Sequence, residues 1–173
     1  GRMIDSSPMY GSSQDVIGYG LDKLGARDRV FSTDKVWTSD DGAEQITETS
    51  DYWNIEKFDL LQVHNLVGIN DNLPLLFDMK DAGRLRYVGV TTSHGRRTDD
   101  LIAVMKNTPL DFVQVTYNPV DRKVEDYLLP LALERGIAVI VNRPFQGGHL
   151  IDRLEGEKLP DFAAEIEVRS WAQ

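Results

Sequence analysis

Cysteine is missing from this sequence of 173 residues, and histidine occurs only three times. Without cysteine the chain has no disulfides, no thiolate nucleophile and no Cys-based zinc or iron–sulfur site. No His-x-His or His-Glu-x-x-His pattern occurs, so a metal-dependent hydrolase barrel lacks its ligands and we expect no metal site. A P-loop and a Gly-x-Ser-x-Gly nucleophile elbow are absent too. These absences argue against metal-dependent hydrolysis, P-loop phosphoryl transfer and serine hydrolysis.

Basic residues and long apolar runs are also scarce. The chain has 19 Lys and Arg against 28 Asp and Glu, a net charge of −9. Nucleic acids and anionic membranes bind cationic faces, so we expect neither as a partner. No apolar run approaches the roughly 18 residues of a membrane span, and no signal peptide is visible. We expect a cytoplasmic protein. Because the sequence begins almost within an apolar segment, an export signal upstream of it would not be seen here.

Six segments rich in apolar and β-branched residues recur along the chain, and their first residues lie 25 to 29 positions apart. These expected strands are Met3–Asp5, Val30–Trp37, Phe58–His64, Tyr87–Thr91, Phe112–Tyr117 and Ala138–Val141. Helical patterns fill the gaps between them, with a weaker one over 42–54. Strands that alternate with helices predict βαβ units and a parallel sheet.

Local signals mark the ends of several expected helices. Gly25, Gly83 and Gly136 stand where three helices should stop, because glycine readily adopts the left-handed cap. Thr98 is typical of a helix start, since the two aspartates after it favour the positive end of the helix dipole. One helical face runs through residues 124–131, and residues 170–173 resemble the start of another helix.

The strand pattern also indicates how the sheet is covered. The strands are almost continuously apolar, as expected when both faces of a sheet are buried. Their regular spacing favours either a barrel or a doubly wound sheet. A full (β/α)8 TIM barrel needs about 250 residues. We therefore expect an α/β fold in which residues 1–173 form a single partial barrel domain of about six parallel strands, with the first strand and the last βα units lying outside it.

Four polar residues stand at the carboxyl ends of the first three expected strands or just after them, where parallel barrels collect their functional groups. Asp5 and His64 each end a strand, Lys35 lies late in one, and Tyr10 follows Asp5 by five residues. Each has an ordinary structural explanation, such as a loop cap for Asp5 or a packing role for Tyr10. Lys35 is the hardest to explain in that way, because lysine is almost never buried without a partner.

Together these residues suit the reduction of a carbonyl group by hydride. The developing alkoxide needs a proton donor, and the ordinary pKa of tyrosine, about 10, is poorly matched to neutral pH. We expect the Lys35 ammonium to lower the pKa of Tyr10, and the Asp5 carboxylate to keep Lys35 charged. His64 would then hydrogen-bond the carbonyl oxygen.

Six motifs, in order along the chain, resemble those of the aldo-keto reductase family and match its strands two to seven. They are Asp5–Gly11, Thr33–Trp37, Asp59–Asn65, Gly89–Thr92, Gln114–Pro119 and Asn142–Phe145. The resemblance implies a (β/α)8 barrel with the tetrad Asp5, Tyr10, Lys35 and His64, in which Tyr10 is the general acid. It further implies NADPH as cofactor, with NADH as a possibility, and small aldehydes or ketones as substrates.

The resemblance also implies a set of cofactor-binding residues. Thr91, Thr92 and Gln114 match positions that hold the nicotinamide carboxamide, and Asn142 stands where many relatives stack an aromatic ring on the nicotinamide. The pyrophosphate loop would be formed by Arg143, Pro144, Phe145 and Gln146.

Asp34, the residue before Lys35, is expected to be buried. Asp34 should point away from Lys35 toward the helices, by strand alternation, so its buried charge needs a partner.

Because fold does not fix function, the chain could instead be a non-catalytic NADP(H)-binding regulatory module, or an inactive fragment. The sequence gives neither the substrate nor the oligomeric state.

Overall fold

The computed structural model describes residues 1–173 and contains one six-stranded parallel sheet, in which each strand pairs with the next from β1 to β6. The strands are β1 Met3–Asp5, β2 Phe31–Val36, β3 Phe58–His64, β4 Leu85–Thr91, β5 Phe112–Thr116 and β6 Ala138–Asn142. The α-helices are α1 Ser13–Leu24, α2 Gly42–Trp53, α3 Ile69–Asp81, α4 Thr98–Asn107, α5 Leu128–Arg135 and α6 His149–Asp152. Short 3₁₀ helices cover Arg27–Arg29, Lys123–Glu125, Gln146–Gly148 and Asp161–Ala164.

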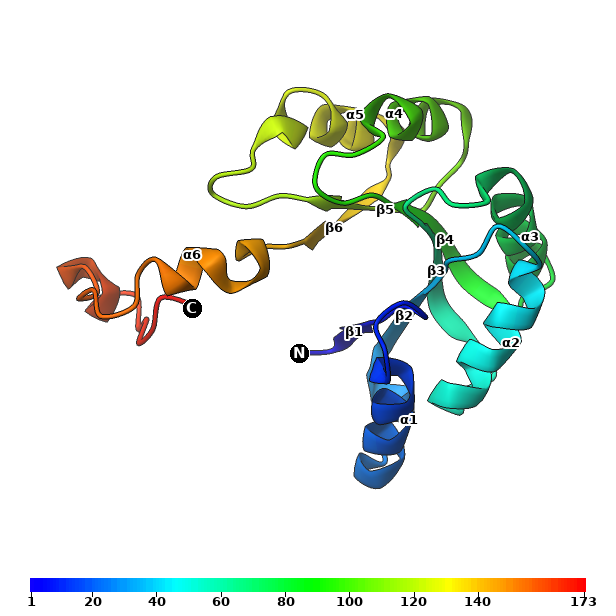
Figure 1. Cartoon of the computed structure of the whole chain (residues 1–173), viewed down its shortest axis with the longest axis horizontal. Helices are drawn as coiled ribbons and strands as arrows, with labels where there is room; N and C mark the ends of the chain where they lie inside the picture. The colour runs from blue at the N-terminus through cyan, green and yellow to red at the C-terminus, as the bar shows by residue number, and fades with distance from the viewer.

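The sheet is curved, and helices α1 to α5 lie along its outer side (Figure 1). Because β1 and β6 do not pair with each other, the sheet is half of a barrel with an open side. This arrangement confirms the predicted α/β class and the incomplete (β/α) barrel. None of the helices is long and apolar enough to cross a membrane.

The strand register separates the inward side chains into layers. Near the amino ends of the strands, Phe31, Tyr87 and Phe112 pack against one another, with ring centroids 5.4 to 6.1 Å apart. Four residues beyond Phe31 on β2 and beyond Tyr87 on β4, the inward positions are polar: Lys35 is in register with Gln62, and His64 with Thr91. The alternation therefore places an apolar floor beneath a polar rim.

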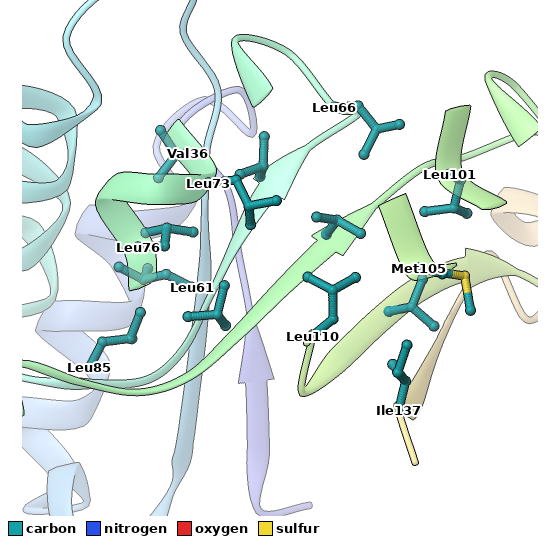
Figure 2. Close-up of a cluster of buried hydrophobic side chains, with 14 of the residues drawn as sticks. Val36, Leu61, Leu66, Leu73, Leu76, Leu85, Leu101, Met105, Leu110 and Ile137 are labelled. Carbon is teal, nitrogen blue, oxygen red and sulfur yellow. The ribbon is translucent and has the colours of Figure 1, made fainter. Parts of the chain in front are cut away.

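The main core lies between the sheet and the helices (Figure 2), where 23 buried apolar residues form one cluster. Leu61 on β3, Leu85 on β4 and Leu76 on α3 belong to its centre, and Leu101 and Met105 extend it under α4. Burying each such side chain contributes about 1.5–3 kcal/mol. The polar rim is thus carried by strands whose opposite faces are firmly packed.

Gly18 explains how tightly α1 and α2 meet. A Cβ atom on Gly18 would lie 1.9 Å from the Tyr52 carbonyl oxygen, so no other residue fits without moving a helix. Gly18 is therefore a packing feature of α1, whereas a Cβ atom on Gly20 would meet nothing within 4 Å.

Two helix expectations were wrong or partly wrong. The helical face over 124–131 is split into a 3₁₀ turn and α5, because Pro130 has no N–H to donate to the carbonyl of Asp126 and would clash with it. Residues 170–173 form a turn instead of starting a helix. By contrast, Gly25 and Gly136 cap α1 and α5 in the left-handed conformation, as predicted.

The chain after β6 does not pack back onto the sheet, and residues 149–173 extend away from it (Figure 1). Val139 and Val141 on β6 are consequently exposed, and both outer sheet edges are free to pair with other chains.

We expect residues 1–173 alone to aggregate or to unfold without a sharp transition, and a Val139→Lys substitution to reduce the aggregation. Light scattering combined with a thermal melt checks this; a cooperative melt with a monomeric mass would contradict it.

Candidate active site

The four predicted tetrad residues meet at one rim of the half-barrel. Lys35 is the centre of the group: its side chain is fully buried, and its Nζ lies 2.6 Å from Asp5 Oδ2. The same ammonium donates to the carbonyl oxygen of Ser6 at 2.6 Å. Removing a charge from water is costly unless it is paired and hydrogen-bonded, and both conditions are met here. Lys35 is thus held as part of an ion pair beneath the mouth of the barrel.

The Tyr10 ring lies against this ion pair, and the His64 ring lies against Tyr10. Lys35 Nζ lies 5.3 Å from the centroid of the Tyr10 ring. The Tyr10 and His64 rings are 5.8 Å apart and nearly perpendicular, at 85°. Tyr10 is 46% exposed, so its side chain is accessible to a small molecule. Its hydroxyl makes no hydrogen bond to Lys35 or to His64.

The expected lowering of the Tyr10 pKa is not found. Burial raises the pKa of Tyr10 above its ordinary 10.0, and the Asp5 and Asp34 carboxylates raise it further. The physical reason is that Asp5 neutralises the ammonium, so Tyr10 faces a pair with little net charge. Burial also lowers the pKa of Lys35, and Asp5 opposes that change. In this arrangement Tyr10 is a neutral phenol throughout the physiological pH range.

His64 is neutral as well. Burial lowers its pKa from 6.5 to about 4, and the nearby Lys35 charge acts in the same direction. Its Nδ1 lies 2.8 Å from the Ser7 hydroxyl, which sequence inspection had not singled out.

We expect His64 to stay neutral down to about pH 5. Since its pKa in the folded protein lies below the unfolded value of 6.5, the stability linked to it is complete above pH 6.5 and falls as the pH drops toward about 4. A ¹⁵N NMR titration of the imidazole measures this directly. Protonation of His64 near pH 6.5 would show that the site is more open to water than the structure indicates.

A second layer of polar groups holds Asp5 in place. Thr33 Oγ1 donates to Asp5 Oδ1 at 3.3 Å, and Gln114 Nε2 donates to Asp5 Oδ2 at 3.2 Å. Gln62 Nε2 in turn donates to Thr33 Oγ1 at 3.2 Å. Gln114 is also one of the predicted cofactor-binding residues, and its amide nitrogen is hydrogen-bonded to the tetrad carboxylate. The rim is therefore one connected hydrogen-bond network across β1, β2, β3 and β5.

Asp34 has the partner that its burial requires. Its Oδ2 accepts from Trp53 Nε1 at 2.7 Å and from Gln14 Nε2 at 3.0 Å, and its Oδ1 accepts from the Lys35 backbone N–H at 2.7 Å. Burial raises the pKa of Asp34 to about 6, against the opposite effect of these donors. Trp53 thus ties α2 to β2 directly behind the catalytic lysine candidate.

The residues predicted to hold the nicotinamide are gathered on the inner side of the same rim. Thr91 and Thr92 are buried at the end of β4, beside Gln114 on β5. Asn142 ends β6, where its Oδ1 accepts from Thr116 Oγ1 at 2.6 Å and its Nδ2 donates to the Thr92 carbonyl at 3.0 Å. Both ends of the Asn142 amide are therefore engaged between strands.

The loop after β6 has an unusual backbone. Arg143 and Gln146 have positive φ angles of 54° and 51°, and Gly147 and Gly148 follow with 71° and 106°. Pro144 and Phe145 between them are exposed. Asn118 buttresses the loop, since its Nδ2 donates to the Arg143 carbonyl at 3.1 Å. Turns of alternating handedness can form anion-binding concavities, so this backbone is compatible with the predicted pyrophosphate loop.

A cavity at the other end of the strands is unrelated to this group. It is lined by charged residues such as Arg2, Asp59 and Arg86, and none of the four tetrad residues contributes to it.

Comparison with known proteins identifies the class to which this fold and rim belong. The model of the aldo/keto reductase family matches residues 1–166. The chain therefore belongs to the aldo/keto reductase family, a family of oxidoreductases.

Individual relatives are distant. Aldo-keto reductase YhdN of Bacillus subtilis is 26% identical over 172 residues, which cover 90% of this chain and 51% of the relative. The NADH-specific methylglyoxal reductase of Escherichia coli is 24% identical, with 99% and 60% covered. The chain thus spans about half to three fifths of these two relatives.

Solved structures show the same fold. An aldo/keto reductase from Klebsiella pneumoniae, in complex with NADP and acetate, superposes with a TM-score of 0.74 at 22% identity and covers 95% of this chain and 60% of its own. One from Brucella melitensis gives 0.76 at 22% identity, with 96% and 65% covered.

Proposed function

We propose that this protein reduces small aldehydes or ketones to alcohols by hydride transfer from NADPH, with Tyr10 as the general acid. The observation that carries the proposal is the ion pair between the fully buried Lys35 and the partly buried Asp5, at 2.6 Å, lying against the half-exposed Tyr10 ring. Two relatives support the substrate class, because they are named a methylglyoxal reductase and a glyoxal reductase. NADH is the second cofactor candidate, since one of them is NADH-specific.

The residues at the rim fit such a cofactor in part. Thr91 and Thr92 would offer their hydroxyl groups to a carboxamide beside the ion pair, and Arg143 with its left-handed backbone suits a phosphate. Asn142 does not supply an aromatic surface, and its amide is already hydrogen-bonded. The bound cofactor would provide the hydride, and we propose that Gln114 contributes indirectly by holding Asp5.

Each tetrad member has a distinct proposed task. Tyr10, a neutral phenol, gives its proton to the carbonyl oxygen as negative charge develops there. Neutral His64 hydrogen-bonds the same oxygen and orients the substrate. Lys35 and Asp5 fix the position of the phenol and keep the site polar without a net charge. We further propose that residues 1–173 form a single partial barrel unit carrying all four groups.

The raised pKa of Tyr10 predicts a pH profile. A phenol that is protonated at and above its ordinary pKa of 10.0 can donate over the whole neutral range. We therefore expect kcat/KM for reduction to be flat from about pH 6 to 9, and alcohol oxidation, which needs the phenolate as base, to rise with pH. A reduction profile that instead falls near pH 7 would indicate that Tyr10 titrates early or that another acid acts.

The alternative is a non-catalytic NADP(H)-binding module of the same fold. The absence of a hydrogen bond between the Tyr10 hydroxyl and Lys35, together with the non-aromatic Asn142, is the specific observation in its favour. Tight NADP(H) binding without turnover of any carbonyl would favour this alternative.

A single assay separates these functions. NADPH and NADH consumption is followed with methylglyoxal, glyoxal and simple aldehydes, alongside cofactor binding measured by fluorescence. The natural full-length protein and residues 1–173 are tested in parallel, because the chain spans only part of its relatives' length. Turnover by the full-length protein supports the proposal; binding without turnover overturns it. Turnover that is absent from residues 1–173 alone identifies that segment as an inactive fragment.

A further inference from the structure

Ser7 is a buried hydroxyl in the loop between β1 and α1, one residue away from the Ser6 carbonyl that binds Lys35. Its side chain is fully buried, and its Oγ lies 2.8 Å from His64 Nδ1. The backbone N–H of Met9 approaches the same oxygen at 3.4 Å. No other protein group bonds to Ser7 Oγ, so these two contacts define what the hydroxyl can do.

The direction of the Ser7–His64 hydrogen bond follows from the need to satisfy buried donors. If Ser7 donates to Nδ1, its hydrogen is used, and its oxygen still accepts from Met9. If Ser7 accepted from a protonated Nδ1 instead, its own hydrogen would have no acceptor, because Ser7 is fully buried and bonds to no other group. Leaving a buried donor unpaired is unfavourable, so the first arrangement is preferred.

A neutral imidazole carries one hydrogen, and the bond made by one nitrogen decides which nitrogen holds it. His64 is neutral because burial and the Lys35 charge disfavour its protonation. With Nδ1 occupied as an acceptor, the hydrogen must be on Nε2. We infer that Ser7 is a positioning residue that fixes His64 in the Nε2–H form, so that His64 presents a donor to a substrate oxygen.

The tautomer of His64 follows from the geometry of Ser7 and His64 alone. Its effect on a substrate rests on the proposed carbonyl reduction. An Nε2–H group attracts a carbonyl oxygen, whereas an unprotonated Nε2 would present a lone pair and repel it. Ser7 would thus act on the substrate only through His64. The site would favour ligands that offer an acceptor oxygen at that position over ligands that offer a hydrogen-bond donor.

The test measures the tautomer itself. The natural full-length protein is labelled with ¹⁵N-histidine, and long-range ¹H–¹⁵N spectra at pH 7 report which nitrogen of His64 is protonated, with His64→Gln used for assignment. We expect a single Nε2–H form in the unmodified protein and a mixture of both forms in Ser7→Ala. Ser7→Thr, which retains a hydroxyl, should return the spectrum toward the single form.

Ser6→Ala is the matched control, because Ser6 is equally buried but its hydroxyl bonds to Ser13 and not to His64. Its His64 signal should remain in the Nε2–H form. A proton on Nδ1 in the unmodified protein would overturn the inference even if no variant folds. An unchanged single form in a folded Ser7→Ala protein would overturn it too.

Kinetics separate this inference from the proposed function. If the protein reduces carbonyls, Ser7→Ala should lower kcat/KM by roughly tenfold while leaving the Kd for NADPH unchanged, because only the donor to the substrate is affected. If the protein has no reductase activity, the proposed function fails but the tautomer measurement still decides the role of Ser7. A changed Kd with an unchanged kcat/KM would contradict a positioning role toward substrate.

Discussion

Replacing Tyr10 by phenylalanine is expected to lower kcat for carbonyl reduction by about 100- to 10,000-fold, the range over which a positioned general acid accelerates proton transfer. The ring contacts that Tyr10 makes with Lys35 and His64 involve the face and edge of the ring, so phenylalanine preserves them. The hydroxyl makes no hydrogen bond to either neighbour. Folding and cofactor affinity should therefore be nearly unchanged, and steady-state NADPH consumption should isolate the loss of the proton donor.

Tyr19→Phe is the control, because Tyr19 is an exposed tyrosine on α1 whose hydroxyl and ring both interact with Lys23. It should keep the activity of the unmodified protein. Turnover by Tyr10→Phe at the same rate as by Tyr19→Phe would remove Tyr10 from the mechanism. A large increase in the Kd for NADPH without a change in kcat would give Tyr10 a binding role instead.

Replacing Trp53 by alanine is expected to destabilise the fold by about 3–5 kcal/mol, the usual cost of deleting a large buried aromatic side chain. Trp53 is completely buried and packs edge-on against Phe58 at 5.3 Å. The Trp53 Nε1–H also donates to Asp34 Oδ2 at 2.7 Å, the shorter of the two hydrogen bonds that Asp34 accepts from side-chain donors. The change in the free energy of unfolding can be measured by urea denaturation of the natural full-length protein.

Trp53→Phe separates the two contributions. It retains most of the ring but removes the Nε1–H donor, so we expect a smaller loss of about 1–3 kcal/mol from the weakened stabilisation of Asp34. Because Asp34 stands next to Lys35 on β2, this variant should also disturb the site. Equal destabilisation by the phenylalanine and alanine variants would show that packing contributes nothing beyond the hydrogen bond. No destabilisation by phenylalanine would show that the Asp34 bond is unimportant.

Much of the fold could be predicted because strand positions follow from strong local patterns. The limits of β1 and β3 agree with those expected from the sequence, and the other strands differ by one or two residues at one end or at both. The burial of Asp34 on the helix side followed from strand alternation alone. The family match and the rim also agree with the motifs, since the ends of parallel strands necessarily meet at one edge.

The remainder depends on groups that are distant in sequence. The need of Asp34 for a partner was predictable, but the donors Gln14 and Trp53 come from two different helices, and only their packing selects them. The pKa of Tyr10 was predicted in the wrong direction because a motif shows the ammonium but neither the burial of the phenol nor how closely Asp5 neutralises the ammonium. Ser7 was overlooked because a small hydroxyl in a loop has no distinctive pattern.

The transfer of a labelled hydride tests most directly whether the four rim residues form a carbonyl-reducing site. The natural full-length protein is incubated with methylglyoxal and NADPH carrying deuterium at the transferable position of the nicotinamide, and the alcohol product is examined by mass spectrometry. Deuterium bound to the former carbonyl carbon, together with its near-complete loss in Tyr10→Phe over the same time, is the expected result. Unlabelled product, no product, or equal labelling in Tyr10→Phe would show that Asp5, Tyr10, Lys35 and His64 do not form a carbonyl-reducing site.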